Sequence, residues 1–130
     1  MVPHGPMNAS SIVNLLPGTV CMPSDTTGSD SFQAVLSSLT APFSGIGILA
    51  AGARPRFADI DPETLQINPN DVGNRITKRT AAIMPVHLYG YMADMDRIMS
   101  VAGNDIAVVE DSAQAVGATY HGKAAGSFGV

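Results

Sequence analysis

Apolar residues from position 44 onward fall into short blocks separated by polar turns, and these blocks predict alternating helices and strands. Residues 44–51 are mostly apolar and precede Gly52, which predicts a helix ending at a C-terminal glycine. Gly45 and Gly47 each weaken this helix by about 1 kcal/mol relative to alanine. Residues 56–60 alternate between apolar and polar side chains and stop at an Asp-Pro pair, as expected of a short strand and turn.

The next helix is predicted to start at Asn68, which can cap it, and to run through Ile76 with Pro69 in the first helical position. Residues 81–87 form an apolar block that is typical of a buried strand. Pro85 has no N–H to donate to a neighbouring strand, so it should lie near the strand end or at a bulge.

A third helix is predicted from the cap Asp94 through Ala102, because apolar residues recur between them at helical spacing and Gly103 follows. Residues 106–109 are continuously apolar, as expected of a strand in a sheet covered on both faces.

This order of elements, with short connections, predicts an α/β fold with a mainly parallel sheet and flanking helices. Ligands of such sheets bind at the carboxyl ends of the strands. Polar clusters follow the predicted strands there, namely Asp59 with Asp61, residues 87–90 and residues 110–114. Their expected convergence is the first indication of a functional site.

The chain up to about residue 37 differs from the rest. Before residue 54 the only charged side chains are Asp25 and Asp30, and Ser, Thr, Gly and Pro are frequent. Such a segment offers little periodic apolar surface, so we expect loop or disorder, and a disrupted reading frame would account for its composition. The predicted division is a poorly patterned segment, 1–37, and an ordered part, 38–130.

Composition narrows the function classes. A net charge of −4 gives no basic footprint for nucleic acid or an anionic membrane surface. Cys21 is the single cysteine, which excludes an intramolecular disulfide and favours a reducing compartment. No apolar run approaches the roughly 20 residues that span a bilayer. We therefore expect a soluble cytoplasmic protein, and we identify no metal-ligand set.

Asp111 directly follows the apolar strand 106–109 and Glu110, and it has two interpretations. It is either an N-cap for a turn that begins at Ser112, or a carboxylate that pairs with a protonated heteroaromatic nitrogen at a dry sheet edge. Gln114 could present an amide to the same ligand from the following turn, or it is a solvated loop residue. The residues alone leave both alternatives open.

Several blocks of the sequence are similar to one enzyme family. Residues 51–61 (AGARPRFADID) resemble the strand-and-turn signature of the DegT/StrS family of pyridoxal-phosphate-dependent aminotransferases. Residues 85–90 (PVHLYG) and 93–96 (ADMD) resemble its next strand and helix start. Residues 109–118 (VEDSAQAVGA) with 122–123 (GK) resemble its cofactor-ring segment and the hairpin after it. The blocks keep the family's order and spacing, which makes the resemblance specific.

The resemblance, over roughly residues 38–130, implies part of the large domain of a fold-type-I pyridoxal-phosphate transferase. It implies that Asp111 bonds the pyridine nitrogen and that Gln114 contacts the ring hydroxyl. The family's loop over the cofactor face matches residues 38–43, where Thr40 is the candidate contact. The usual aromatic residue is absent there, and Phe43 is the candidate substitute for stacking.

For the cofactor phosphate, the family pattern of a Gly-Thr pair at a helix start matches Gly18 and Thr19. Pro23 follows early and no helical stripe is present, so Thr19 is either a phosphate contact or part of a turn. His87 and Tyr89 lie at the expected sheet edge, and we interpret both as structural.

The resemblance places the catalytic Schiff-base lysine beyond residue 130, so no catalytic residue is assigned within the chain. Lys78 and Lys123 are the two lysines present, and we interpret both as surface charges. We therefore expect the isolated chain to be inactive.

The implied parent enzyme transfers an amino group, typically from glutamate, to a nucleotide-linked keto sugar, and is a homodimer with pyridoxal 5'-phosphate as cofactor. Two alternatives stay open. One is a sugar dehydratase of the same fold, in which histidine replaces the lysine. The other is a truncated α/β module without catalysis.

Overall fold

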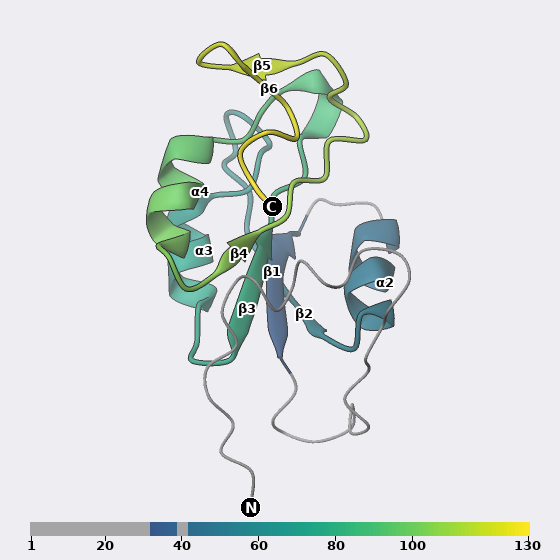
Figure 1. The fold of residues 1–130 in the computed structure, drawn as a ribbon, viewed down its shortest axis with the longest axis vertical. Coiled ribbons are helices and arrows are strands. Elements are labelled where there is room, and N and C mark those ends of the chain that lie inside the picture. The colour runs from purple at the N-terminus through teal and green to yellow at the C-terminus, as the bar shows by residue number, and fades with distance from the viewer. Residues whose placement is uncertain (1–31, 39–41) are drawn as a thin grey trace, which may run out of the picture.

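The computed structural model describes residues 32–38 and 42–130, and its centre is a parallel sheet of four strands (Figure 1). The strand order is β2-β1-β3-β4, and each neighbouring pair is parallel. The strands are β1 (Gln33–Ser37), β2 (Arg54–Ala58), β3 (Thr80–Met84) and β4 (Ala107–Val108). Because consecutive strands run the same way, every connection crosses over through a helix.

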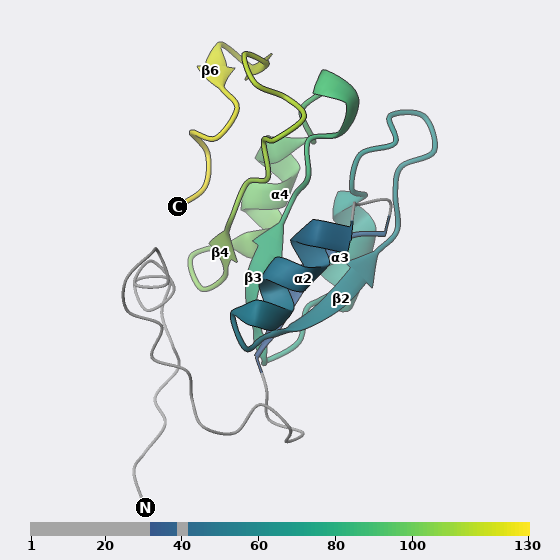
Figure 2. The ribbon, with the colours of Figure 1, turned by 90° about the vertical axis from the view of Figure 1, so that its right-hand side faces the viewer.

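Helices cover both faces of this sheet. One face carries α2 (Pro42–Ala50), and the other carries α3 (Pro69–Arg75) and α4 (Met95–Ala102), as two views of the chain show (Figures 1 and 2). The predicted fold class, a mainly parallel sheet with flanking helices, is confirmed.

Two small elements lie beyond the carboxyl ends of the strands (Figure 1). A single 3-10 turn, η1 (Leu88–Gly90), follows β3. An antiparallel hairpin of β5 (Thr119–Tyr120) and β6 (Lys123–Ala124) comes after β4. Short turns and a hairpin therefore follow β3 and β4 at the carboxyl edge of the sheet.

The buried apolar residues form two clusters, one on each face of the sheet. The larger cluster lies against α3 and α4 and consists of Val35, Ala58, Ile67, Val72, Ile83, Ala93, Met95, Ile98, Ala102 and Val108. The smaller cluster lies against α2 and consists of Ala34, Leu36 and Ile48. Since neighbouring residues of β1 alternate between the clusters, this strand is buried on both faces.

The predicted caps of α3 and α4 are confirmed, whereas α2 runs from Pro42 to Ala50 instead of 44–51. Asn68 caps α3, its side chain accepting from the N–H of Asn70. Asp94 caps α4 by accepting from the N–H of Arg97. Gly103 ends α4 at φ 59°, a backbone conformation that glycine adopts with little cost.

Strand β1 was not predicted, because its residues lie in the segment interpreted as poorly patterned. All five of its residues are buried, including the polar Gln33 and Ser37, so it shows no alternation of apolar and polar positions. The Oε1 of Gln33 accepts hydrogen bonds there from Arg56 at 3.3 Å and Thr77 at 3.2 Å. The interpretation of residues 1–31 lies outside the described residues.

All three predicted strands have different bounds in the structure. Strand β3 runs from Thr80 to Met84 instead of 81–87, because it ends before Pro85, which has no N–H to donate. Strand β2 starts and ends two residues before the predicted 56–60, because its pairing with β1 runs from Arg54 to Ala58. Ile60 instead forms an isolated bridge with Ile67. Strand β4 is limited to Ala107–Val108. Within the described part of the chain, no helix is long and apolar enough to cross a membrane.

Candidate cofactor site

The candidate site lies at the carboxyl edge of the sheet, where the chain leaves β3 and β4 side by side. Val86 and Asp111 form a parallel bridge beyond the two strands. The N–H of Asp111 donates to the carbonyl of Pro85 at 2.9 Å, and the N–H of His87 donates to the carbonyl of Asp111 at 3.0 Å. The backbone of Asp111 is therefore held on both its N–H and its carbonyl.

The Asp111 carboxylate faces the side of the sheet that carries α2. Its Oδ2 accepts a 2.7 Å hydrogen bond from the hydroxyl of Ser44 in the first turn of α2. Its Oδ1 accepts from the N–H of Ala113 at 3.2 Å. Since each carboxylate oxygen has two lone pairs, these bonds orient the group and leave acceptor capacity for a cationic N–H donor. The group thus caps a turn, as one predicted alternative has it, and its binding of a ligand stays a prediction.

Gln114 is exposed and is attached to the turn after β3. Its Oε1 accepts from the backbone N–H of Tyr89 at 3.2 Å. Tyr89 has a positive φ of 57°, which is uncommon for a residue other than glycine. With Oε1 engaged, the side-chain NH₂ of Gln114 is the group that can donate to a ligand oxygen.

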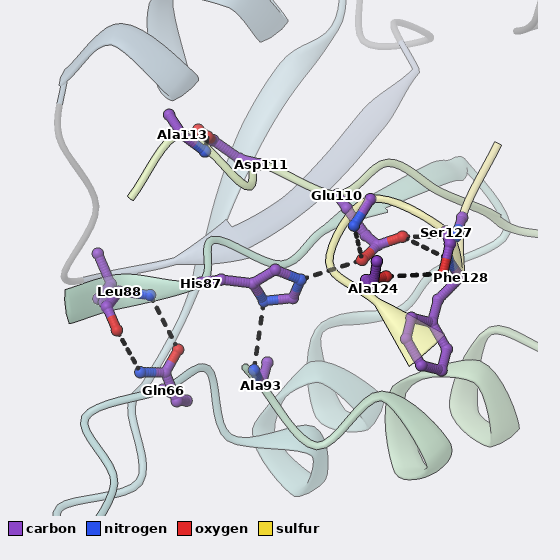
Figure 3. A network of polar contacts seen from close by, with 12 residues as sticks. Gln66, His87, Leu88, Ala93, Glu110, Asp111, Ala113, Ala124, Ser127 and Phe128 are labelled. Atoms are coloured by element: carbon purple, nitrogen blue, oxygen red, sulfur yellow. Dashed lines mark hydrogen bonds and ion pairs between the residues drawn. The ribbon is translucent and has the colours of Figure 1, made fainter. Parts of the chain in front are cut away.

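Glu110 faces the opposite side of the sheet from Asp111 (Figure 3). Its carboxylate accepts from His87 Nε2 at 3.1 Å and from the N–H groups of Gly126, Phe128 and Gly129 at 2.9, 2.6 and 2.8 Å. Burial raises the pKa of Glu110, but these hydrogen bonds outweigh it, so the pKa lies below its ordinary value of 4.5.

His87 is fully buried and contacts two elements (Figure 3). Its Nδ1 accepts from the N–H of Ala93 at 3.2 Å, so the ring proton resides on Nε2 and points at Glu110. Gln66 holds the residue after His87 in place, because its side-chain amide forms two 3.1 Å hydrogen bonds with the backbone N–H and carbonyl of Leu88. These contacts support the structural interpretation of His87, since neither ring nitrogen is left for catalysis.

Two of the three predicted polar clusters meet at this edge. Hydrogen bonds join residues 87–90 to residues 110–114, as described above. The carboxylates of the third cluster, Asp59 and Asp61, accept from N–H groups of their own loop. They form turns there, and their part in the site stays a prediction.

The remaining predicted residues lie elsewhere or outside the described chain. Thr19 and Thr40 are outside the described residues. Phe43 is 79% exposed in the first turn of α2. Lys78 precedes β3 at the amino end of the sheet, so about six strand residues, roughly 20 Å, separate it from the level of Asp111. Lys123 lies in the exposed hairpin, with Nζ 5.5 Å from the ring centre of Phe128.

Sequence reasoning missed the residues that support the site. Ser44 gave no signal, because a serine in the first turn of a helix is common. Gln66 gave a weak signal, as a polar residue between Leu65 and Ile67. Glu110 gave a stronger signal, because it stands next to Asp111 at the end of a strand. Two consecutive acids at a strand end must face opposite sides, so one of them needs partners away from the ligand.

Known proteins resemble this chain in sequence. The model of the DegT/DnrJ/EryC1/StrS aminotransferase family matches residues 33–130. The chain is 51% identical over 84 residues to the pleiotropic regulatory protein of Geobacillus stearothermophilus, covering 64% of this chain and 23% of that protein. It is 46% identical over 98 residues to the GDP-perosamine synthase of Caulobacter vibrioides, covering 75% of this chain and 26% of that protein. The chain therefore spans about a quarter of the length of these relatives.

The fold is also similar to a solved structure. A crystal structure of GDP-4-keto-6-deoxymannose-3-dehydratase with a trapped PLP-glutamate geminal diamine matches with a TM-score of 0.72 and 31% sequence identity. The match covers 77% of this chain and 26% of that one. The described residues thus have the fold of one part of the large domain of a fold-type-I pyridoxal-phosphate enzyme.

Proposed function

Because the chain belongs to the DegT/DnrJ/EryC1/StrS aminotransferase family, we propose that it forms part of an enzyme that aminates a nucleotide-linked keto sugar with pyridoxal phosphate as cofactor. The amino donor in this proposal is glutamate. Residues 33–130 supply the part of the large domain that contacts the cofactor ring, and the complete enzyme acts as a cytoplasmic homodimer.

The residues at the sheet edge fit the cofactor ring. Asp111 is a partly buried carboxylate held by Ser44 and Ala113, so it can pair with a protonated ring nitrogen without losing its orientation. Gln114 can donate from its NH₂ group to the ring hydroxyl oxygen. When bound, pyridoxal phosphate supplies an electron sink that works only while its ring nitrogen is protonated.

The observation that carries the proposal is the hydrogen bond from Ser44 to Asp111. The serine hydroxyl holds the carboxylate in one orientation and leaves lone pairs on its oxygens for a cationic N–H donor. The chain's own contribution is thus to hold a negative charge at a fixed point and to keep the ring nitrogen protonated.

Binding of pyridoxal phosphate to the purified chain tests this proposal. Asp111→Asn should raise the Kd about tenfold to a hundredfold, because a hydrogen bond to a charged group contributes about 1.5–3 kcal/mol. The titration can follow the absorbance of the bound cofactor. The matched control is Asp105→Asn, at an exposed aspartate in the turn after α4. Equal affinities of the two variants and the unchanged chain would contradict the proposal.

Borohydride treatment of the chain with bound pyridoxal phosphate examines the lysines separately. Lys78 and Lys123 are exposed, and Lys78 lies at the far end of the sheet from Asp111. We expect no specific covalent adduct at either residue by mass spectrometry. A stoichiometric adduct at one of them would make that lysine a catalytic candidate.

Dehydration at a sugar carbon is the second candidate function, favoured by the similarity to the GDP-4-keto-6-deoxymannose-3-dehydratase structure. In this family the deciding residue lies beyond the positions matched here, where a lysine implies amination and a histidine implies dehydration. Incubating the complete enzyme with a nucleotide-linked keto sugar and glutamate distinguishes them, since only amination leaves glutamate nitrogen on the sugar.

A further inference from the structure

Glu110 is a buried carboxylate that the proposed cofactor site does not use. Its side chain is 3% exposed, and that of its partner His87 is 0% exposed. Three backbone N–H groups and one imidazole N–H converge on its two oxygens. A buried charge is stable only when it is paired and hydrogen-bonded. The four donors around Glu110 therefore form an anion-binding site, and the carboxylate of Glu110 is the anion that occupies it.

The three backbone donors all come from the segment 126–130, which follows the β5–β6 hairpin. The same segment touches β4 directly, since the N–H of Val130 donates to the carbonyl of Val108 at 2.9 Å. A Cβ atom at Gly129 would collide with the carbonyl oxygen of Val108. The segment is thus seated on the backbone of β4, with Glu110 holding it from one side.

We propose that Glu110 is a positioning residue whose carboxylate fixes the segment 126–130 against β4 and thereby holds the strand end that presents Asp111. The part that concerns Asp111 rests on the proposed function. The seating of the segment does not, because it follows from the contacts of Glu110 alone.

His87 fixes the other end of this arrangement. Its Nδ1 is committed to the N–H of Ala93, just before the cap of α4, so its Nε2–H remains a donor to Glu110. The exchanged tautomer would leave the Ala93 N–H unpaired in a buried place, which is unfavourable. Glu110 therefore connects the start of α4, the end of β3 and the segment 126–130.

Alternation along the strand links this arrangement to Asp111. Val108 and Glu110 face the side of α3 and α4, while Asp111 faces Ser44 on the side of α2. Glu110 thus acts from the face opposite the cofactor. Moving it would shift the peptide bond that it shares with Asp111, and with it the carboxylate on the other face.

Glu110→Gln tests the role of the charge. The variant keeps the volume, but its NH₂ group must take the place of Oε2, which faces His87 and Gly126, or of Oε1, which faces Phe128 and Gly129. Every group that it would face is a donor. We expect the Phe128 and Gly129 amides to exchange with solvent at least about tenfold faster, because charge-assisted hydrogen bonds are lost. Nuclear magnetic resonance of the ¹⁵N-labelled chain measures this exchange and the His87 ring tautomer together.

The matched control is Glu63→Gln, at the only other glutamate of the chain, which is exposed. It should leave both readouts unchanged. Unchanged exchange of Phe128 and Gly129 in Glu110→Gln would overturn the proposal.

Two further variants keep the test independent of folding defects at Glu110. Gly129→Ala should release the segment through its collision with Val108 while Glu110 is intact. In Glu110→Ala, added formate should re-enter the site between His87 and the backbone donors and slow the exchange of Phe128 and Gly129 again. Failure of formate to restore protection in a folded Glu110→Ala chain would contradict a role of the carboxylate itself.

Pyridoxal phosphate affinity, measured on the same variants, separates the two proposals. Weaker binding of pyridoxal phosphate to Glu110→Gln and Gly129→Ala supports the proposal that the segment 126–130 positions Asp111. Unchanged binding in a variant whose segment is released overturns that proposal. If the unchanged chain binds no pyridoxal phosphate, the proposed function fails, while the amide and His87 readouts still decide the seating of the segment.

Discussion

Glu110 and Asp111 are neighbours in the chain with opposite surroundings. Asp111 is partly exposed, and its carboxylate accepts two hydrogen bonds, one of them from Ser44 in α2. Glu110 is buried and accepts four. The pleat of the strand separates them, so one acid is available to a ligand and the other supports the fold.

Acid titration should expose the contribution of Glu110 to stability. Its pKa is lowered in the folded chain because its hydrogen bonds outweigh the effect of burial, so the unfolded state takes up the proton first as pH falls. The stabilisation is therefore fully present above about pH 4.5 and decreases as pH falls toward the lower folded-state pKa.

Glu110→Gln should lower the free energy of unfolding by about 2–4 kcal/mol at pH 7, because buried donors lose a charged partner. The difference from the unchanged chain should narrow as pH decreases below about 4.5, where that chain loses its own contribution. Urea unfolding at a series of pH values measures both. A difference that stays constant between pH 7 and the acid range would count against this assignment.

At the scale of elements, the glycines of the helices differ in what they do. Gly47 lies within α2, and a Cβ there would meet nothing within 4 Å. Gly103 ends α4 at φ 59°, where its N–H donates to the carbonyl of Met99. The first therefore lowers helix propensity without a local steric need, whereas the second is required by the backbone.

Gly47→Ala should raise the free energy of unfolding by about 0.5–1 kcal/mol, since alanine has the higher helix propensity and space is free. Gly103→Ala should lower the free energy of unfolding by about 1 kcal/mol or more, because a side chain is strained at this positive φ. Denaturant unfolding compares the stabilities of the two variants, provided that the dependence of the unfolding free energy on denaturant concentration has the same slope in both. Equal effects of both substitutions would contradict the distinction.

Across the whole molecule, one face of α2 carries apolar residues that the described chain does not cover. Phe43, Ile46 and Leu49 are 79%, 56% and 58% exposed, while Ile48 on the other side of the helix is 3% exposed. Among the described strands, β2 pairs only with β1, which leaves its outer edge available. Exposed apolar stripes and open strand edges promote association.

The isolated chain should therefore self-associate, and Ile46→Gln with Leu49→Gln should reduce this while changing the free energy of unfolding by less than about 0.5 kcal/mol per site. Sedimentation over a range of concentrations measures association. Ile48→Gln is the contrasting variant, because it places a polar group in the core and should destabilise the chain by about 3 kcal/mol. A chain that is monomeric at high concentration would contradict the prediction.

The sequence by itself determined the fold class, the helix caps at Asn68 and Asp94, and the family resemblance around Asp111. These depend on local chemistry, namely side chains that bond their own backbone and apolar periodicity along a short stretch. Strand β1 could not be predicted in this way. A central strand buried on both faces has no alternation, and its polar residues are satisfied by distant partners such as Arg56.

Only the tertiary structure decided which residues act together at the sheet edge. Ser44 and Asp111 are 67 positions apart, and Gln66 and Leu88 are 22 apart. Packing of the helices on a twisted sheet brings such pairs together, and no local pattern encodes that distance. The same packing gave Glu110 its partners, because the direction of a side chain depends on the register of its strand.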